Sequence, residues 1–335
     1  MNLVTGATGH LGANLVRRLL EDGEPVRVLL REGTDTRAVD GLAVERVVGD
    51  IRDYGRTLAA VRGCRRVYHC AAKVSNAEGQ EREIYETNVV GARHVLHAAV
   101  EARVERVVVT GSFSAVGHDP TRPVDETVPV DPFGKLLPYQ RSKIAVEHEC
   151  LKAVVEGLDV VIATSCAILG PNDFHPSRMG QLLLDFANGR LRAYIPGGFE
   201  FVAARDIAEG HRLAMEKGRT GHKYIFSTEF KTVDELMDIY EAVTDRRRPR
   251  LRLPRALMLG IAHITARALR LVAPNAPQRF TPGAVRMLGM QRRANIAKAR
   301  TELGYQPTSI RRANEEQYAF FVGQGWIRRP RWGSA

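Results

Sequence analysis

The chain has 335 residues, of which 44% are hydrophobic and 26% are charged. This length and composition are ordinary for a globular protein with a large core, and they exclude a disordered, collagen-like or disulfide-rich chain. The formal net charge is +11 at pH 7, and the excess of Arg and Lys lies after Arg246. Because no helix-turn-helix, zinc-finger or aromatic RNA-binding pattern accompanies it, we expect a solvated basic face and no nucleic-acid binding.

The cysteines and the first residues bear on the compartment. Cys64, Cys70, Cys150 and Cys166 form no CxxC pair and no Cys/His cluster with zinc spacing. They predict reduced thiols and no metal site. The first residues lack the basic start of a signal peptide and lead directly into strand-like and turn-like sequence. We therefore expect a cytoplasmic protein.

Short apolar runs alternate with longer helical patterns over the first two-thirds of the chain. Strands are predicted at 3–4, 26–30, 44–48, 66–68, 107–110 and 160–163. Helices are predicted at 14–21, 54–62, 83–102 and 139–156. Strands that alternate with helices favour a parallel sheet covered on both faces, and right-handed crossovers then favour a doubly wound α/β fold of the Rossmann type.

The pattern loosens after Gly170-Pro171. Residues 171–200 mix Pro, Gly and aromatic residues around one apolar helix at 179–188, whereas a helix at 206–215 and a strand at 224–227 return to the sheet. The Arg-rich turn at 246–249 leads into a basic, helical region. We predict a Rossmann domain of residues 1–170 and 201–242. A smaller, discontinuous, mostly helical substrate-binding domain would comprise 171–200 and 243–335.

A glycine-rich turn lies between the first predicted strand and helix. Glycines allow a tight turn and a close approach of the backbone to a pyrophosphate. The following helix N-terminus offers free N–H groups and the positive end of a dipole. This context predicts a nicotinamide dinucleotide site at Gly6, Thr8, Gly9, His10, Leu11 and Gly12.

The end of the second predicted strand bears on the choice of cofactor. An acidic residue there would hold the ribose hydroxyl groups, and an arginine would hold a 2′-phosphate. Arg31 occupies this place, with Arg27 as a helper, and favours NADP(H). Glu32 can point at the same site, so NAD(H) stays an alternative. Further cofactor contacts are expected after the third and fourth strands, at Asp50, Ile51, Ala71 and Ala72.

Tyr139 and Lys143 are four residues apart and share one face of a predicted helix. A nearby ammonium favours a phenolate, so Lys143 is expected to lower the pKa of Tyr139 from its ordinary value near 10. Tyr139 would then exchange a proton near neutral pH. Ser112 follows the strand that contains Thr110, and its hydroxyl is placed to bond a carbonyl oxygen beside Tyr139.

With these features in order, the sequence resembles the extended short-chain dehydrogenases/reductases. The resemblance covers about residues 1–230, and the segment 302–307 resembles the family's C-terminal end. It rests on the glycine turn, Asp50, Ala71-Ala72, Asn88, Ser112, the Tyr139/Lys143 pair and Gly170-Pro171.

The resemblance implies a role for each matching residue. Tyr139 would be the acid/base, Lys143 would lower its pKa and hold the nicotinamide ribose, and Ser112 would orient the substrate oxygen, with Ser114 as a rival. Asn88 and Thr110 would line the cofactor site. The family further implies a homodimer through the two long helices.

Two positions discriminate among branches of the family. Sugar-nucleotide dehydratases carry an Asp-Glu pair where this chain has Phe113 and Ser114, so dehydration is excluded. Many sugar-nucleotide enzymes carry a pyrophosphate-gripping Arg where this chain has Phe199 beside Glu200. An apolar ring and a carboxylate are hostile to a diphosphate, although another arginine, Arg178 or Arg192, would be an alternative source of charge.

The remaining resemblance is to the dihydroflavonol 4-reductase-like and 3β-hydroxysteroid dehydrogenase-like branch. It implies an NADPH-dependent reductase of a ketone or aldehyde on a fairly apolar small molecule, with substrate contacts at Ser114, Phe174 and Phe199. Two alternatives stay open. One is a sugar or sugar-nucleotide epimerase with tightly held NAD, and the other is a non-catalytic dinucleotide sensor.

The stretch 254–274 is rich in apolar residues. It is too short to span a bilayer, and it contains His263, Arg267 and Arg270. Three interpretations stay open. The stretch is a core helix, a wall of an apolar substrate pocket, or a helix that lies on an anionic membrane.

Overall fold

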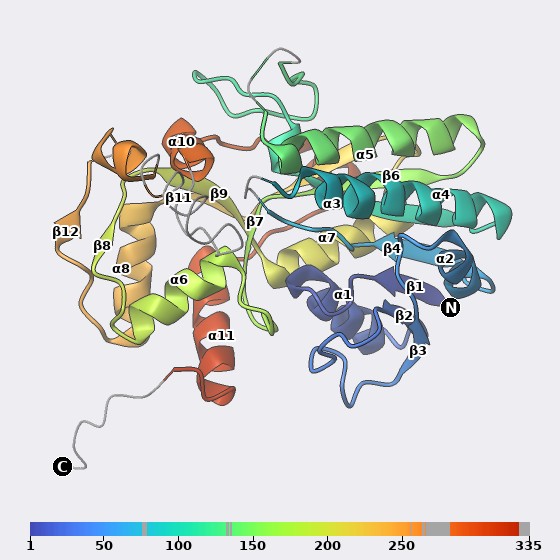
Figure 1. Cartoon of the computed structure of the whole chain (residues 1–335), viewed down its shortest axis with the longest axis horizontal. Coiled ribbons are helices and arrows are strands. Elements are labelled where there is room, and N and C mark those ends of the chain that lie inside the picture. Colours follow the sequence, from blue (N-terminus) through green and yellow to red (C-terminus); the bar gives the residue numbers. More distant parts are fainter. Residues whose placement is uncertain are drawn as a thin grey trace.

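A seven-stranded parallel sheet forms the centre of the molecule (Figure 1). The computed structural model describes residues 1–75, 79–131, 134, 136–254, 256–262, 265 and 282–327. The strand order is β10-β6-β5-β4-β1-β2-β3, and every neighbouring pair runs parallel. The strands are β1 (Asn2–Thr5), β2 (Val26–Leu30), β3 (Val44–Val48), β4 (Arg66–His69), β5 (Arg106–Ser112), β6 (Val160–Ser165) and β10 (Lys223–Phe226). This topology confirms the predicted doubly wound Rossmann fold.

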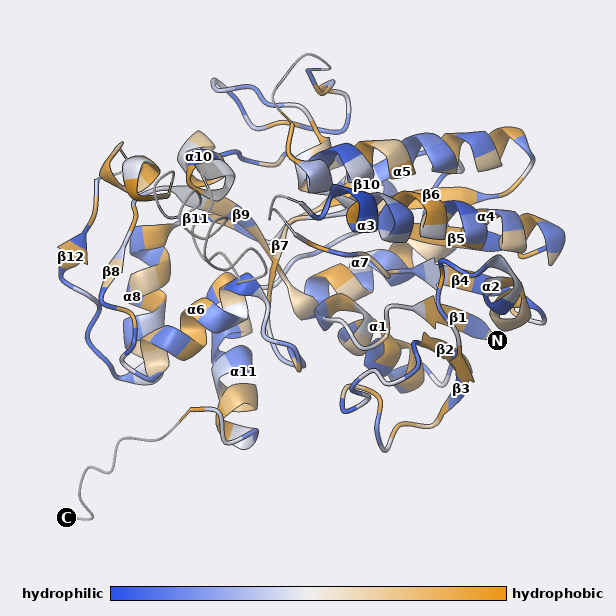
Figure 2. Cartoon of the chain, viewed as in Figure 1, coloured by the Kyte–Doolittle hydropathy of each residue, from blue (hydrophilic) through white to orange (hydrophobic). Residues whose placement is uncertain are grey.

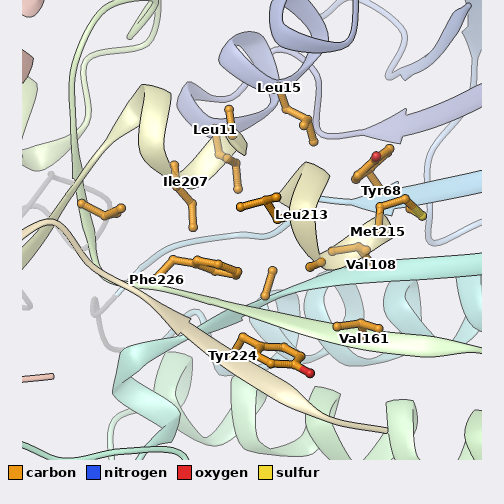
Figure 3. Close-up of a cluster of buried hydrophobic side chains, with 14 of the residues drawn as sticks. Leu11, Leu15, Tyr68, Val108, Val161, Ile207, Leu213, Met215, Tyr224 and Phe226 are labelled. Carbon is orange, nitrogen blue, oxygen red and sulfur yellow. The ribbon is translucent and has the colours of Figure 1, made fainter. Parts of the chain in front are cut away.

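Helices cover both faces of this sheet. On one face, α1 (His10–Glu21) and α7 (Ala204–Lys217) pack against each other and against β-strand side chains, including those labelled in Figure 3. The other face is covered by α2 (Tyr54–Val61), α4 (Gly91–Glu101) and α5 (Pro138–Val155). Strand β5 shows why both faces are apolar. Val108 faces the α1/α7 side, whereas Val107 and Val109 face the α2/α4/α5 side, because successive side chains of a strand alternate.

Three short elements, α3 (Glu81–Tyr85), η1 (Glu86–Val90) and η2 (Phe113–Ala115), follow the carboxyl ends of the central strands β4 and β5. Helix α3 runs into the π-helical turn η1 and then into α4. Together, α3, η1 and α4 occupy the stretch that was predicted as one long helix at 83–102. The 3₁₀ turn η2 follows β5 directly. A single π-turn inside a helix is often found at a functional site.

The second lobe combines helices with short strands. It contains α6 (Arg178–Ala187), α8 (Val233–Thr244), α10 (Pro282–Met290), the π-turn η3 (Ala299–Leu303) and α11 (Ile310–Gly323). Strands β7 (Ala167–Leu169), β9 (Gly198–Ala203) and β11 (Glu229–Thr232) form a three-stranded sheet in the order β11-β9-β7, and β8 (Ala193–Tyr194) pairs with β12 (Leu251–Arg252). None of these five strands was predicted, because four of them have only two to four residues and β9 begins within a Pro-Gly-Gly sequence.

The packing of α8 bears on the predicted division into domains. The buried side chains of α8 pack with those of α6 and α11 in one apolar cluster. Residues 201–242, which include most of α8, were assigned to the Rossmann part. The packing favours moving α8 to the substrate-binding part, and the division itself stays a prediction.

The predicted apolar stretch after residue 254 is only partly described. Residues 256–262 are helical, whereas His263, Arg267 and Arg270 lie outside the described residues. Within the described part of the chain, no helix is both long and apolar enough to cross a bilayer. Hydropathy follows the same layering, with apolar residues concentrated in the central strands and on the inner faces of the helices (Figure 2).

Candidate active site

The glycine turn lies where the strand order reverses, between β1 and β4. Gly6 has a φ of +71°, and a Cβ added to it would lie 2.6 Å from the backbone nitrogen of Ala71, just after β4. A Cβ added to Gly12 would lie 2.2 Å from the carbonyl oxygen of Gly6. Both positions therefore require glycine, and the close approach of Ala71 brings the two strand ends together. Ligands of open α/β sheets bind at such a switch point.

The start of α1 has the chemistry of a phosphate site. The N-cap residue Gly9 has no side-chain cap, and its own N–H bonds to the carbonyl oxygen of Gly6 at 3.0 Å. The following amides of the first turn have no partner within the helix, because no residue precedes them in the helical hydrogen-bond pattern. Free amides and the positive end of the helix dipole fit a pyrophosphate, so the residues present fit a dinucleotide.

Two residues predicted in this turn have other side-chain contacts. The Nε2 atom of His10 lies 3.1 Å from the carbonyl oxygens of both Gly170 and Pro171, and its Nδ1 lies 3.9 Å from Asp173. The imidazole therefore holds the segment after β7 against α1. Leu11 is buried in the apolar core. Only the backbone of these two residues is placed to serve a cofactor.

Two predicted cofactor contacts, Arg31 after β2 and Asp50 after β3, lie near each other at the carboxyl ends of these strands. Arg31 directly follows β2 and is exposed. Hydrogen bonds from Arg52 hold the pKa of Asp50 below its usual value, and the charge of Arg31 adds to this effect. An open hollow of about 430 Å³ lies beside them, lined by Asp50, Arg52, Asp53, Glu86 and Val90.

Arg27 does not help Arg31 as expected. It lies at the amino end of β2, where its guanidinium pairs with Glu45 at 2.9 Å and donates to the carbonyl oxygens of Ala60 and Arg62. A parallel strand of five residues separates its two ends by roughly 13–16 Å. The strand position of Arg27 therefore excludes it from the cofactor edge.

Other predicted cofactor contacts fall into two groups. Ala71 and Ala72 follow β4 at the switch point and are partly exposed, beside the glycine turn. Ile51 is buried, and it packs against Gly91 at the start of α4. Its carbonyl oxygen lies 2.9 Å from Nδ1 of His94. The side chain of Ile51 thus anchors the helix that borders the hollow.

The hydroxyl groups of Ser112 and Tyr139 meet at the carboxyl end of β5. Ser112 hydrogen-bonds the phenol of Tyr139, which opposes the effect of burial. Burial is the larger effect, and it raises the pKa of Tyr139 above its ordinary value near 10. Ser112 Oγ also lies 2.8 Å from Ser114 Oγ. The three hydroxyls form one cluster at the edge of the sheet.

Lys143 lies one turn after Tyr139 on α5, and its ammonium turns toward the sheet. Its Nζ donates to the carbonyl oxygen of Thr110 at 2.8 Å, and its side chain is buried. Burial lowers the pKa of Lys143 from 10.5 to about 8. The expected lowering of the Tyr139 pKa by this ammonium is not seen, because the charge is directed to Thr110 and the phenol is itself desolvated.

Thr110 connects Lys143 to a buried histidine that sequence reasoning did not single out. The Nδ1 atom of His211 lies 2.8 Å from the carbonyl oxygen of Ile207, so Nδ1 carries the proton. The Nε2 atom then accepts a hydrogen bond from the Thr110 hydroxyl at 2.9 Å. Burial lowers the pKa of His211 to about 4, which keeps it neutral.

Asn88 lies in the π-turn η1 and is fully enclosed. Its Oδ1 accepts from the backbone N–H of Lys73 at 2.7 Å, and its Nδ2 donates to Ser142 Oγ at 2.9 Å. Ser142 Oγ in turn donates to the carbonyl oxygen of Tyr139 at 2.7 Å. Asn88 therefore ties the segment after β4 to the first turn of the helix that carries Tyr139.

The predicted substrate residues differ in their surroundings. Ser114 belongs to the hydroxyl cluster. Phe174 is buried with Ala13 and Ala38. Its ring packs edge-on against that of Phe320, with 4.9 Å between the ring centres. Phe199 is partly buried on β9, between the apolar cluster of α6, α8 and α11 and the one beneath α10. Phe174 therefore supports the lobe, and Ser114 and Phe199 stay candidates for substrate contact.

Glu200 does not face an open site. Its two carboxylate oxygens accept from Ser227 Oγ at 2.5 Å and from the backbone N–H of Ala294 at 3.0 Å. Burial raises its pKa, and the bond from Ser227 opposes this effect. Its expected hostility to a diphosphate therefore does not follow from its position.

An unpredicted arginine contacts the segment after Ser112. Arg292 donates from Nη2 to the carbonyl oxygens of Val116 and Gly117, each at 2.6 Å, and its guanidinium lies 4.6 Å above the centre of the Phe113 ring. Its position in the sequence, after a basic helix far from β5, gave no signal of this contact. Both alternatives considered for an extra charge, Arg178 and Arg192, are exposed.

Titratable groups elsewhere form no metal site in the described residues. No three His, Cys, Asp or Glu side chains gather there as ligands, and the four cysteines are free thiols.

Comparisons with known proteins agree with this geometry. A family model described as the NAD dependent epimerase/dehydratase family matches residues 2–226. Sterol demethylase protein B of Methylococcus capsulatus is 44% identical over 325 residues, which cover 97% of this chain and 99% of that protein. A putative dihydroflavonol 4-reductase of Synechocystis is 33% identical over 334 residues, which cover 97% and 95%. The crystal structure of gox2253 superposes with a TM-score of 0.86 at 31% identity, covering 98% and 99%.

The family match includes the strands and helices that hold the glycine turn and the tyrosine–lysine pair. Members of this family use a nicotinamide dinucleotide, and the relatives match the chain over nearly its whole length. The chain therefore belongs to the NAD dependent epimerase/dehydratase family of extended short-chain dehydrogenases/reductases, and it is an NAD(P)-dependent oxidoreductase.

Proposed function

We propose that the chain is an NADPH-dependent reductase of a ketone or aldehyde group on a fairly apolar small molecule. The observation that carries the proposal is the hydroxyl cluster. Ser112 bonds the phenol of Tyr139 at the carboxyl end of β5, beside the buried ammonium of Lys143. A phenol and a serine hydroxyl that converge on one point suit a carbonyl oxygen that becomes an alcohol.

A bound nicotinamide dinucleotide would supply the hydride. The chain's own residues perform the remaining work. Tyr139 donates its phenolic proton to the substrate oxygen, and Ser112 donates a hydrogen bond that holds this oxygen in place. The positive charge of Lys143, one helical turn from Tyr139, would stabilise the phenolate left on Tyr139, and its ammonium would also hold the ribose of a bound dinucleotide. The neutral imidazole of His211 accepts a hydrogen bond from the Thr110 hydroxyl and donates one to the carbonyl oxygen of Ile207.

The preference for NADPH rests on Arg31. Arg31 directly follows β2, where its guanidinium would meet the negative charge of a 2′-phosphate. The neighbouring Asp50 is already paired with Arg52, so it competes little for Arg31. Use of NAD(H) is the alternative, and Glu32 beside Arg31 is the feature that favours it.

The apolar character of the substrate is supported by the residues near the site and by the relatives. Phe199 places a partly buried aromatic ring on β9. The two relatives reported above are named for a sterol and for a flavonoid compound, both polycyclic. We propose that the second lobe, chiefly 171–200 and the region after 243, encloses such a substrate.

Two further features of the protein are proposed. The protein acts in the cytoplasm, with peripheral contact to an anionic membrane. It forms a homodimer through α4 and α5, as in the family, and Leu151 and Val155 of α5 support this because they are 49% and 89% exposed.

The test is a substrate screen combined with the substitution Tyr139→Phe. We expect the parent protein to oxidise NADPH in the presence of apolar ketones or aldehydes. Removing the proton donor lowers kcat by at least about 100-fold while the affinity for NADPH is retained. Unchanged turnover in Y139F would refute the mechanism. A protein that retains bound NAD through purification and consumes no free NADPH would identify an epimerase, and dinucleotide binding without turnover of any carbonyl would favour the sensor.

A further inference from the structure

The C-terminal part of the chain carries an uninterrupted positive charge. No Asp or Glu occurs between Asp245 and Glu302, whereas Arg and Lys recur throughout that stretch. Two of these arginines are neutralised by α8, since Arg248 pairs with Asp238 at 2.7 Å and Arg252 pairs with Asp234 at 2.8 Å. The rest of the charge needs another explanation.

Three other arginines of this region are exposed. They are Arg247, Arg250 and Arg286, and no ion pair is recorded for them with any described residue. Arg247 and Arg250 flank the turn before β12, and Arg286 lies on α10. An unpaired guanidinium at the surface is available to an external anion.

Large apolar side chains are exposed on the same elements. Leu251 of β12 is 56% exposed, Leu257 and Ile261 of the helix 256–262 are 52% and 39% exposed, and Met290 of α10 is 42% exposed. The inner faces of these elements are already buried, because Met258, Ala262, Val285 and Leu288 form one cluster with Ile195. The exposed set is therefore a second apolar face that the described residues leave uncovered.

These elements lie together at one end of the molecule. The helix 256–262 packs on α10, and β12 pairs with β8 beside them. Figure 1 shows β12, this helix and α10 at the end of the second lobe, on the opposite side of the molecule from α2 and α4. We call this surface, made of Leu251, Leu257, Ile261, Met290, Arg247, Arg250 and Arg286, the C-terminal docking surface.

We propose that the C-terminal docking surface binds an anionic lipid bilayer. Aliphatic side chains enter the boundary between headgroups and acyl chains, and arginines at their edge contact lipid phosphates. The absence of exposed aromatic rings in the set argues against single-stranded nucleic acid, which is bound by stacking. The combination of aliphatic residues and unpaired positive charge fits a bilayer better than either a neutral protein partner or a polyanion.

The docking surface gives the proposed substrate class a source. Its elements belong to the lobe that is proposed to enclose the substrate, so docking would bring that lobe to molecules dissolved in the membrane. This consequence rests on the proposed reductase function. The docking surface itself deepens the peripheral membrane contact proposed above by naming the residues that make it, and it does not depend on the reductase activity.

Flotation of the full-length protein with vesicles tests the proposal without any substrate. We expect binding to vesicles that contain about one-third phosphatidylglycerol, and little binding to neutral phosphatidylcholine vesicles or at about 0.5 M NaCl. The double variant L257S/I261S and the double variant R247Q/R250Q should each reduce the bound fraction by about tenfold or more. The control variant V48S, which changes an exposed apolar residue outside the surface, should bind like the parent.

The outcomes separate the alternatives. Equal binding to neutral and anionic vesicles, or parent-like binding by both surface variants, would overturn the proposal. Binding to duplex DNA or RNA without binding to vesicles would assign the charge to nucleic acid instead. Thermal unfolding and NADPH binding of each variant show whether it is folded. A failed reductase screen leaves the vesicle result unaffected, so the two proposals fail independently.

Discussion

Lys143 places a positive charge in a buried position with a single carbonyl oxygen, that of Thr110, as its recorded hydrogen-bond partner. A buried ammonium costs free energy unless it is well paired. In the proposed mechanism this side chain serves the chemistry at Tyr139, which would explain why the fold keeps a costly buried charge. Such a residue should trade stability for function.

The substitution Lys143→Met tests this trade. The pKa of Lys143 is about 8 in the folded protein, below the ordinary value of 10.5 that applies to the unfolded chain. Between these two pH values the unfolded chain therefore holds a proton that the folded chain has released. Stability of the parent therefore rises with pH through this window, and the full cost is present below it. At neutral pH we expect K143M to be more stable by about 2 kcal/mol, after allowing for the lost bond to Thr110.

Urea unfolding at pH values below and above this window measures the effect. The advantage of K143M should shrink as the pH approaches 10.5. Lys152 on the same helix is exposed and pairs with Glu149, so K152M is the matched control and should change stability by less than about 0.5 kcal/mol. A K143M protein that is less stable than the parent at neutral pH would contradict the interpretation of a costly buried charge.

Arg31 is the residue on which the choice of dinucleotide depends. We expect Arg31→Ala to weaken NADPH binding by about tenfold or more, because it removes a charge-assisted contact with the 2′-phosphate. NADH binding should be unchanged. Fluorescence titration of both dinucleotides measures the difference, with Glu32→Gln as the control that retains Arg31. An equal loss for both dinucleotides would assign Arg31 a role other than phosphate recognition.

At the scale of elements, the turn between β1 and α1 is set by contacts of backbone with backbone. The three glycines have unequal steric requirements. A Cβ at Gly12 would lie 2.2 Å from the Gly6 carbonyl oxygen, whereas one at Gly9 would lie 3.3 Å from the same atom. The first contact requires the turn to shift, and the second needs only a small adjustment.

The pair Gly12→Ala and Gly9→Ala tests this gradation. We expect G12A to lose dinucleotide affinity by at least about tenfold and to destabilise the fold by about 1–3 kcal/mol, because the turn and the start of α1 must move apart. G9A should retain a folded structure and most of its affinity. Calorimetric titration and thermal unfolding measure both effects, and equal behaviour of the two variants would show that steric contact does not control the turn.

At the scale of the whole molecule, a segment from the C-terminal third contacts the loop that follows Ser112. The backbone of residues 293–295 forms a bridge with Val124, and Ala294 donates to Glu200. Arg292, at the start of this segment, reaches the carbonyl oxygens of Val116 and Gly117. The second lobe therefore supports the loop that begins at Ser112.

The substitution Arg292→Met tests this support. Loss of the two hydrogen bonds should free the loop after Phe113, so that Ser112 is held less firmly and kcat falls by about tenfold. NADPH affinity should be unchanged, because the contacts of Arg292 are with Val116, Gly117 and Phe113 and not with the glycine turn. The neighbouring Arg293, which lies over the Phe230 ring, gives the matched variant R293M, and it should retain kcat. A fall in NADPH affinity without a fall in kcat would contradict this role.

The sequence predicted the elements whose patterns are local. Strands β2 and β3 were predicted with the bounds that the structure shows, because short runs rich in Val and Leu and bounded by turn residues are distinctive. The glycine turn, Ser112, Tyr139 and Lys143 were recognised because their order and spacing are properties of the chain itself. Strands β8 and β12 were missed, because two residues are too few to show a side-chain pattern.

The sequence by itself determined the Rossmann fold, the family and the residues of the hydroxyl cluster. Only the tertiary structure decided what those residues contact. It assigned the His10 side chain to the segment after β7, removed Arg27 from the cofactor edge, enclosed Phe174 and brought Arg292 to Phe113. The physical reason is that a motif fixes local backbone geometry, whereas burial, ion pairing and desolvation depend on neighbours supplied by the whole fold.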